Sequence, residues 1–103
     1  MKRIVDGHKY DTETATEIAN TRYSAPGDFG YWSETLYKTI NGRYFIDGEG
    51  GPLSMYSESI GNNSIAGRRW ITPLSREEAY KWCEEHDQVD AIENEFSDKV
   101  KDA

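Results

Sequence analysis

The chain offers few side chains of the types that catalyse reactions. It has one cysteine, Cys83, and two histidines, His8 and His86, and none of them lies in a recognisable catalytic or metal-binding motif. Nothing close to Cys83 in the sequence would lower the pKa of its thiol, so we interpret this residue as a small buried apolar side chain. His86 falls at the expected end of a helix, where an imidazole suits the helix dipole. The sequence therefore predicts no catalytic residue and no enzyme activity.

Residues 47–51, with the sequence Asp-Gly-Glu-Gly-Gly, combine carboxylates with glycines, as some calcium and phosphate sites do. The segment lacks the further oxygen ligands and the final glutamate of an EF-hand, and it lacks the Gly-Lys-Ser/Thr ending of a P-loop. A single cysteine also excludes zinc sites built from several thiolates. We therefore predict no metal and no other cofactor, and we interpret residues 47–52 as an irregular turn.

Acidic side chains are concentrated near the C-terminus. Residues 1–74 carry nine acidic and eight basic side chains, whereas residues 75–103 carry ten acidic and four basic ones, and the whole chain has a net charge of −7. Such a run is typical of a solvated helix face, and it also complements a basic partner protein. We predict that six carboxylates bind this partner: Glu84, Glu85, Asp87, Asp90, Glu93 and Glu95.

Two further features bear on the kind of partner. An acidic protein is repelled by phosphate backbones, so we expect no direct binding of nucleic acid in spite of the pair Arg68-Arg69. Aromatic side chains recur between residues 29 and 44, but base-stacking surfaces usually lie in a basic groove. Core packing explains these aromatics better, and any that are exposed would suit a protein interface. They are Phe29, Tyr31, Trp32, Tyr37 and Tyr44.

The length of 103 residues predicts one domain, 1–103, because two halves would each be too small to bury a stable core. The N-terminus has no apolar stretch typical of a signal peptide, and no apolar run approaches the roughly 18 residues of a membrane span. We expect a cytoplasmic protein without membrane contact. Residues from about 97 to 103 are expected to fray.

The first third of the chain indicates a hairpin followed by a helix. Residues 2–5 and 8–10 flank Asp6-Gly7, a pair that tolerates the positive φ angles of a tight hairpin turn. Asp11 or Thr12 is positioned to cap a helix that would extend to Asn20. Residues 21–33 then read as a connecting loop.

The strongest strand pattern predicts a central hairpin over residues 34–46. A three-residue loop that ends at Gly42 places Tyr37 opposite Phe45 and Leu36 opposite Ile46, a better match than a two-residue turn provides. Both faces of this hairpin carry bulky side chains, so we expect elements packed on each side. A strand over residues 68–72, ended by Pro73, would extend it to a sheet of about three strands. The polar segment between them is interpreted as a loop, with a short helical turn around residues 53–56 as the alternative.

Two helices are expected at the C-terminal end. Ser75 and Glu78 have the spacing of a capping box, so a helix should begin here with Ala79, Trp82 and Cys83 on its apolar side. A second amphipathic helix is predicted from four apolar residues spaced three and four apart: Val89, Ile92, Phe96 and Val100. The predicted fold class is α+β, with a small antiparallel sheet, an N-terminal hairpin and helix, and one or two C-terminal helices.

Four sets of residues carry a resemblance to a known family. They are Val5-Asp6-Gly7 with Tyr10-Asp11-Thr12, then residues 34–37, then residues 48–51, then Pro73-Leu74-Ser75 with Glu78-Ala79 and Trp82. With these segments, which cover most of its length, the chain resembles small acidic proteins encoded on mobile elements, prophages and plasmids of Gram-positive bacteria. Some small acidic proteins of this setting are anti-CRISPR inhibitors, and the resemblance implies that role by association alone.

Two functions follow as expectations. The first is a non-catalytic inhibitor from a mobile element that binds a CRISPR effector complex and covers its basic nucleic-acid channel with the acidic surface. The alternative is an accessory or structural subunit of the element's own transfer or regulation machinery, with a homodimer built on exposed aromatic residues as one form of it.

Overall fold

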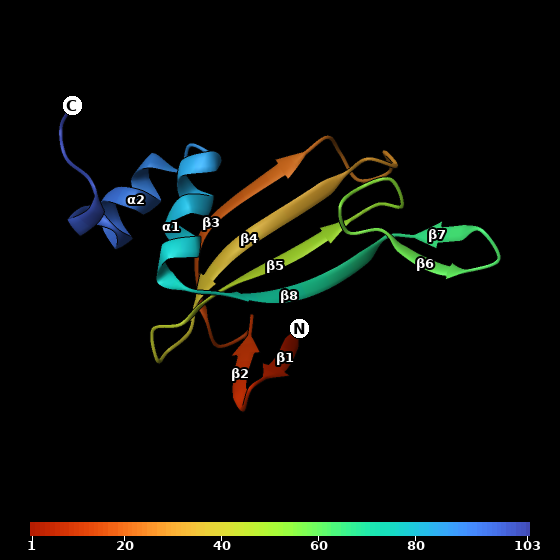
Figure 1. Cartoon of the computed structure of the whole chain (residues 1–103), viewed down its shortest axis with the longest axis horizontal. Helices are drawn as coiled ribbons and strands as arrows, with labels where there is room; N and C mark the ends of the chain where they lie inside the picture. Colours follow the sequence, from red (N-terminus) through yellow and green to blue (C-terminus); the bar gives the residue numbers. More distant parts are fainter.

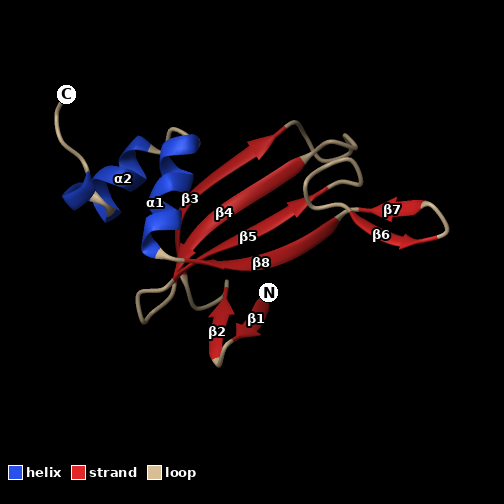
Figure 2. Ribbon diagram, viewed as in Figure 1, coloured by secondary structure: helices blue, strands red, loops and turns tan.

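A four-stranded antiparallel sheet of order β3-β4-β5-β8 forms the centre of the molecule (Figures 1 and 2). The structure, a computed structural model, describes residues 1–103 and has the α+β fold expected from the sequence. None of its helices has the length and apolar content needed to cross a membrane. The strands are β1 (Lys2–Val5), β2 (His8–Asp11), β3 (Thr16–Tyr23), β4 (Trp32–Lys38), β5 (Tyr44–Gly50), β6 (Glu58–Gly61), β7 (Ser64–Ala66) and β8 (Arg68–Leu74). The helices are α1 (Arg76–Glu85), α2 (Val89–Glu95) and a short 3-10 turn, η1 (Ser97–Lys99).

The two predicted hairpins are confirmed. Strands β1 and β2 pair across Asp6-Gly7, which have φ angles of 51° and 76° as a primed turn requires. Strands β4 and β5 pair in the expected register, with Tyr37 opposite Phe45, and Gly42 has a φ of 87°. Because β4 and β5 are the two inner strands, the hairpin is central, as its two bulky faces predict.

The helix predicted over residues 12–20 is wrong, because the chain there forms strand β3. Asp11 does start one helical turn: its side chain accepts a hydrogen bond from the backbone N–H of Glu13 and its carbonyl accepts one from Ala15. The turn stops at Ala15, and the residues from Thr16 onward pair with β4 over its whole length. Long-range strand pairing here overrides the local capping signal, as tertiary context often does.

Three boundaries around the glycine-rich segment also differ from prediction. Residues 47–50 are part of strand β5 and not an irregular turn. Residues 61–64, predicted as loop, form the turn of the small hairpin β6–β7, with Asn62 and Asn63 at φ angles of 43° and 64°. Pro73 does not end its strand, since β8 extends to Leu74; β8 is an edge strand, where a residue without N–H is tolerated.

Both C-terminal helices are present. Ser75 and Glu78 form the predicted capping box at the start of α1. The apolar stripe predicted for the second helix is only half right: Phe96 is fully buried, but Val89 and Val100 are exposed. Helix α2 ends at Glu95 and the chain tightens into η1, so the spacing of three and four is broken before Val100.

Each face of the sheet carries its own apolar cluster. Helices α1 and α2 cover one end of one face (Figure 1) and enclose a cluster of Leu36, Tyr44, Ile46, Ala79, Trp82, Cys83, Ala91 and Phe96. The hairpin β1–β2 lies on the other face, where Tyr10 packs against Phe45 and Ile71. Of the five aromatic residues assigned to the core, Tyr44 lies in the first cluster and Tyr37 packs against the second. Tyr31 and Trp32 are only partly buried and belong to neither cluster, and Phe29 is exposed in the loop between β3 and β4, so the prediction is confirmed only in part.

Glycine is required at position 48 because the loop of residues 51–57 folds back onto the sheet there. A Cβ atom on Gly48 would overlap the phenol ring of Tyr56, and one on Gly50 would overlap the side chain of Ser54. The glycines that suggested a turn in the sequence thus allow a loop to pack closely on a strand.

We predict that Gly48→Ala lowers the free energy of unfolding by about 1–3 kcal/mol, the usual cost of overpacking, in a urea titration. Gly30→Ala is the matched control, because a Cβ at Gly30 would meet its nearest atom, Asp28 Oδ1, at an ordinary 3.5 Å. Combined with Tyr56→Ala, the Gly48 substitution should cost little more than Tyr56→Ala alone. Equal stability of Gly48→Ala and the wild type would contradict this account.

Candidate functional site

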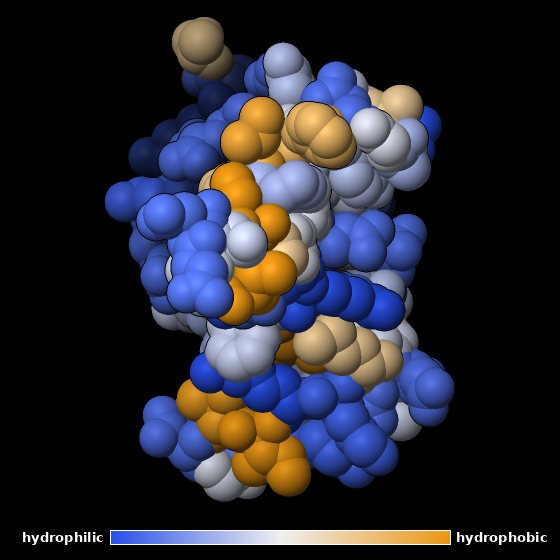
Figure 3. Space-filling view, turned by 90° about the vertical axis from the view of Figure 1, so that its right-hand side faces the viewer, coloured by the Kyte–Doolittle hydropathy of each residue, from blue (hydrophilic) through white to orange (hydrophobic).

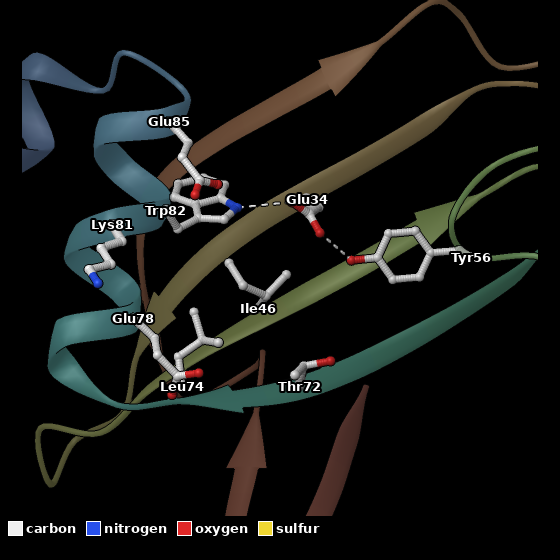
Figure 4. Close-up of a pocket in the computed structure, with 9 residues that line it drawn as sticks. All are labelled: Glu34, Ile46, Tyr56, Thr72, Leu74, Glu78, Lys81, Trp82 and Glu85. Carbon is white, nitrogen blue, oxygen red and sulfur yellow. Dashed lines mark hydrogen bonds between the residues drawn. The ribbon is translucent and has the colours of Figure 1, made fainter.

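A pocket of about 340 Å³ lies on the helix-covered face of the sheet, between α1 and the loop of residues 51–57 (Figure 4). Strands β4, β5 and β8 form its floor, the side of α1 forms one wall, and Tyr56 forms the opposite wall. We call it the Glu34 pocket after the carboxylate that lies between Trp82 and Tyr56 in its lining (Figure 4). Its lining consists of Glu34, Ile46, Tyr56, Thr72, Leu74, Glu78, Lys81, Trp82 and Glu85.

The Glu34 carboxylate is held by one donor on each oxygen. Trp82 Nε1–H donates to Oε1 at 2.9 Å, and the hydroxyl of Tyr56 donates to Oε2 (Figure 4). The side chain of Glu34 is only 13% exposed. Burial, together with the hydrogen bond to Glu34, raises the pKa of Tyr56 far above its usual value. Tyr56 therefore stays protonated and acts as a fixed donor to the carboxylate.

His86 adjoins this carboxylate. It is the C-terminal cap of α1, as predicted, and its Nε2 lies 3.8 Å from Glu34 Oε1. Its ring centre is 4.9 Å from that of Trp82 and 6.0 Å from that of Trp32. Glu34 thus has hydrogen-bond donors and aromatic rings around it, an environment that orients a carboxylate rather than one that creates a nucleophile.

Cys83, the strongest nucleophile by residue type, is outside this pocket. It is fully buried in the apolar cluster behind α1, as the sequence predicts. Burial raises the pKa of its thiol to about 11, so the reactive thiolate is scarce at neutral pH. No three His, Cys, Asp or Glu side chains come together in an arrangement that could hold a metal ion.

Five of the six carboxylates predicted to bind a partner are exposed and free of ion pairs. Glu84 and Glu85 lie at the end of α1, Asp87 in the following turn, and Asp90 and Glu93 on α2. None of these five forms a salt bridge, although Glu84 accepts a hydrogen bond from Tyr80. We call these five residues the acidic surface.

The sixth residue, Glu95, has an internal role. Its carboxylate pairs with Lys38 Nζ at 3.0 Å and accepts a hydrogen bond from the hydroxyl of Tyr44 at 2.9 Å, so it ties α2 to strands β4 and β5. Its side chain is 21% exposed. Glu95 therefore presents less charge to a partner than the other five carboxylates do.

The pair Arg68-Arg69 is likewise engaged within the molecule. Arg69 pairs with Asp47 through two hydrogen bonds, and the guanidinium of Arg68 lies 5.1 Å from the ring centre of Trp70. Arg68 is also 3.8 Å from a carboxylate oxygen of Glu58. The charges of Arg68 and Arg69 are thus partly neutralised by Glu58 and Asp47 of the same molecule.

The end of the sheet opposite the helices exposes apolar side chains. The loops of residues 24–31 and 51–57 and the hairpin β6–β7 meet there, and Figure 3 views the molecule from this end with apolar atoms in orange between polar ones. We call this the distal apolar surface; it includes Tyr23, Phe29, Leu53, Met55, Ile60 and Ile65, each at least half exposed.

Sequence reasoning missed the Glu34 pocket because its residues are far apart in the chain. Tyr56 and Trp82 are 22 and 48 positions from Glu34. The sequence places Trp82 correctly on the apolar side of α1, but Tyr56 lies in a segment that the sequence predicts to be a polar loop, which indicates no role for it. The one local signal that points to the site is the position of Glu34 two residues from Trp32 and from Leu36, on the same face of a central strand.

Comparison with protein-family models, with curated proteins and with solved structures gave no match for this chain. The resemblance described above therefore stays a prediction. Of the segments that carry it, two contribute side chains to the Glu34 pocket, through Glu34, Leu74, Glu78 and Trp82.

We predict that the stabilising effect of Glu95 depends on pH. Burial raises the pKa of Glu95, but the hydrogen bonds from Lys38 and Tyr44 outweigh it, so the pKa in the folded protein lies below its usual value. Such a carboxylate stabilises the fold above its unfolded pKa, and this contribution is lost as the pH falls through the folded pKa. Glu95→Gln should therefore cost about 1–3 kcal/mol of unfolding free energy at pH 7 and less at about pH 3.

The matched control is Glu93→Gln, on the same helix but exposed and without an ion pair. It should unfold like the wild type at both pH values in urea titrations. A cost for Glu95→Gln that is the same at pH 7 and pH 3 would contradict the assignment.

Proposed function

We propose that this protein is a non-catalytic binding protein that docks its acidic surface on a basic surface of a partner protein in the cytoplasm. The observation that carries the proposal is that residues 84–93 present five exposed carboxylates without ion pairs. This stretch of ten residues contains no Lys or Arg. The other acids nearby, Glu95, Glu77 and Asp98, form ion pairs with Lys or Arg side chains of the same molecule. Exposed charge of one sign repels itself and is favourable mainly when a surface of the other sign covers it.

The partner class that fits best is a CRISPR effector complex. Its nucleic-acid channel must be basic in order to bind phosphate backbones, so a compact acidic protein can occupy it in place of nucleic acid. The resemblance to proteins of Gram-positive mobile elements supports the same choice. The engagement of Arg68 and Arg69 inside the molecule supports a protein partner over direct binding of nucleic acid.

Binding without chemistry is favoured by the state of the reactive side chains. The Cys83 thiol is buried, and its pKa is raised to about 11. The Glu34 carboxylate is fixed by two donors, so it is better suited to hold a ligand than to move a proton.

The test is an interference assay in which the protein is expressed beside a panel of CRISPR systems from Gram-positive hosts and surviving phage or targeted plasmid is counted. We expect survival to be restored against at least one system. The variant Glu84→Lys/Asp90→Lys/Glu93→Lys should lose at least about tenfold of that protection, because charge reversal opposes a basic partner.

The control is Glu13→Lys/Glu17→Lys/Asp102→Lys, which changes the net charge equally at exposed positions outside the acidic surface. It should protect like the wild type. Protection against no system would refute the CRISPR target, and equal protection by both variants would refute docking through the acidic surface.

The distal apolar surface favours a second candidate function, an accessory subunit that self-associates or binds another protein of the same element. Large exposed apolar patches are typical of interaction sites. Sedimentation equilibrium should then show a dimer that Leu53→Asp/Met55→Asp converts to a monomer, whereas Ile40→Asp, at an exposed apolar position in the β4–β5 turn, should leave it unchanged. A wild-type monomer at every concentration would refute self-association.

A further inference from the structure

The charge of Glu34 is not balanced by a permanent cation. Among the other poorly exposed carboxylates, Asp47 and Glu95 pair with Arg69 and Lys38. Asp11, which also has no ion pair, accepts a hydrogen bond from the backbone N–H of Glu13 and lines no pocket with Glu34. Glu34, with a side chain 13% exposed, has only His86 within ion-pair distance, and His86 carries charge only when protonated. Withdrawing a carboxylate from water without a cation is unfavourable, and such an arrangement in a pocket is typical of a site that binds a charged ligand.

The carboxylate has unused hydrogen-bonding capacity. Each carboxylate oxygen can accept about two hydrogen bonds. Trp82 uses one position on Oε1 and Tyr56 uses one on Oε2, so each oxygen can accept a further bond. Two parallel acceptors match the planar fork of a guanidinium group, and the two donors hold the carboxylate in place before a ligand arrives.

The rest of the pocket suits an aliphatic stem that ends in a positive charge. Ile46 and Leu74 supply apolar surface at the floor, and Glu78 and Glu85 add negative charge along the α1 wall. Lys81 is the one Lys or Arg in the lining, and Figure 4 shows its amino group turned away from Glu34. The volume of about 340 Å³ lies in the range of pockets that bind small ligands.

We propose that the Glu34 pocket binds an organic cation, a guanidinium in preference to a primary ammonium, carried on an aliphatic stem. This group is the side chain of an arginine or lysine in a protein, or a free small molecule of the same chemistry. The positive group pairs with Glu34, and the stem lies over Ile46 and Leu74. The pocket shares Glu85 with the acidic surface, but the proposal does not require that this surface docks on a partner protein.

The test uses the purified protein and N-acetyl-arginine amide, with the indole N–H resonance of Trp82 followed by NMR. This N–H bonds directly to Glu34, so its chemical shift reports on the carboxylate. We expect a saturable shift with millimolar or tighter affinity. N-acetyl-citrulline amide, which has the same shape without the charge, should bind at least about tenfold more weakly. No saturable shift, or an equal shift with citrulline, would overturn the proposal.

Two variants locate the site. Glu34→Gln should weaken arginine binding at least about tenfold, whereas Glu93→Gln, which removes an exposed carboxylate on α2, should not. If Glu34→Gln unfolds, Thr72→Tyr serves instead, because Thr72 is an exposed residue of the pocket lining without a bond to Glu34. Unchanged binding in Thr72→Tyr and in any folded Glu34→Gln protein would place the cation elsewhere and overturn the assignment.

A further titration separates the two sources of the cation. Tighter binding of the peptide acetyl-Gly-Arg-Gly-amide than of free arginine would assign the pocket to a protein side chain. Tighter binding of free arginine or agmatine would assign it to a small molecule. Because this experiment uses no partner protein, its outcome is separate from that of the interference assay.

Discussion

The carboxylate of Glu34 joins three parts of the chain that are distant in sequence. Its backbone belongs to the inner strand β4, one oxygen bonds to Trp82 of α1, and the other bonds to Tyr56 in the loop after β5. Hydrogen bonds to an ionised group are among the stronger polar interactions in proteins, and these two are largely shielded from water. This side chain holds the Tyr56 ring, and with it one wall of the pocket, while backbone hydrogen bonds from Gly51 and Leu53 to Tyr31 and Phe29 hold the start of the loop. The loop can reach Glu34 only because Gly48 has no side chain of its own.

The C-terminal segment is attached to the sheet by a different combination of forces. Phe96 is fully buried against Tyr44 and Tyr80, and burial of a phenylalanine contributes roughly 2–3 kcal/mol. The ion pairs Arg76–Asp98 and Lys99–Glu77 lie at the surface, where such pairs contribute little to stability. These pairs nevertheless neutralise the charges of Asp98 and Glu77. The unpaired carboxylates of residues 84–93 thus lie on a helical segment that is held to the sheet mainly by apolar packing.

Local chemistry in the sequence predicts the parts of this fold that are decided locally. The Asp6-Gly7 turn, the Gly42 position and the Ser75 capping box need only neighbouring residues, and all three are as expected. The errors arise where distant pairing decides. The cap at Asp11 starts a helical turn, but the residues after Ala15 pair with β4 and become part of the sheet. The glycines of residues 48–51 look like a turn because nothing nearby reveals that Tyr56 folds over them. The sequence does not predict the pocket for the same reason, because Tyr56 and Trp82 are distant from Glu34 along the chain.

The two ends of the sheet differ in character, and the Glu34 pocket lies between them. The molecule measures 51 × 35 × 19 Å, with the acidic surface on the helices at one end and the distal apolar surface at the other. Electrostatic attraction acts over a Debye length of roughly 10 Å at moderate salt, whereas apolar surface contributes only on contact. In a complex of the proposed kind, the acidic end would set the orientation of the encounter. The apolar end and the pocket would then add short-range contacts, so the charge would guide the approach and these contacts would decide which partner stays bound.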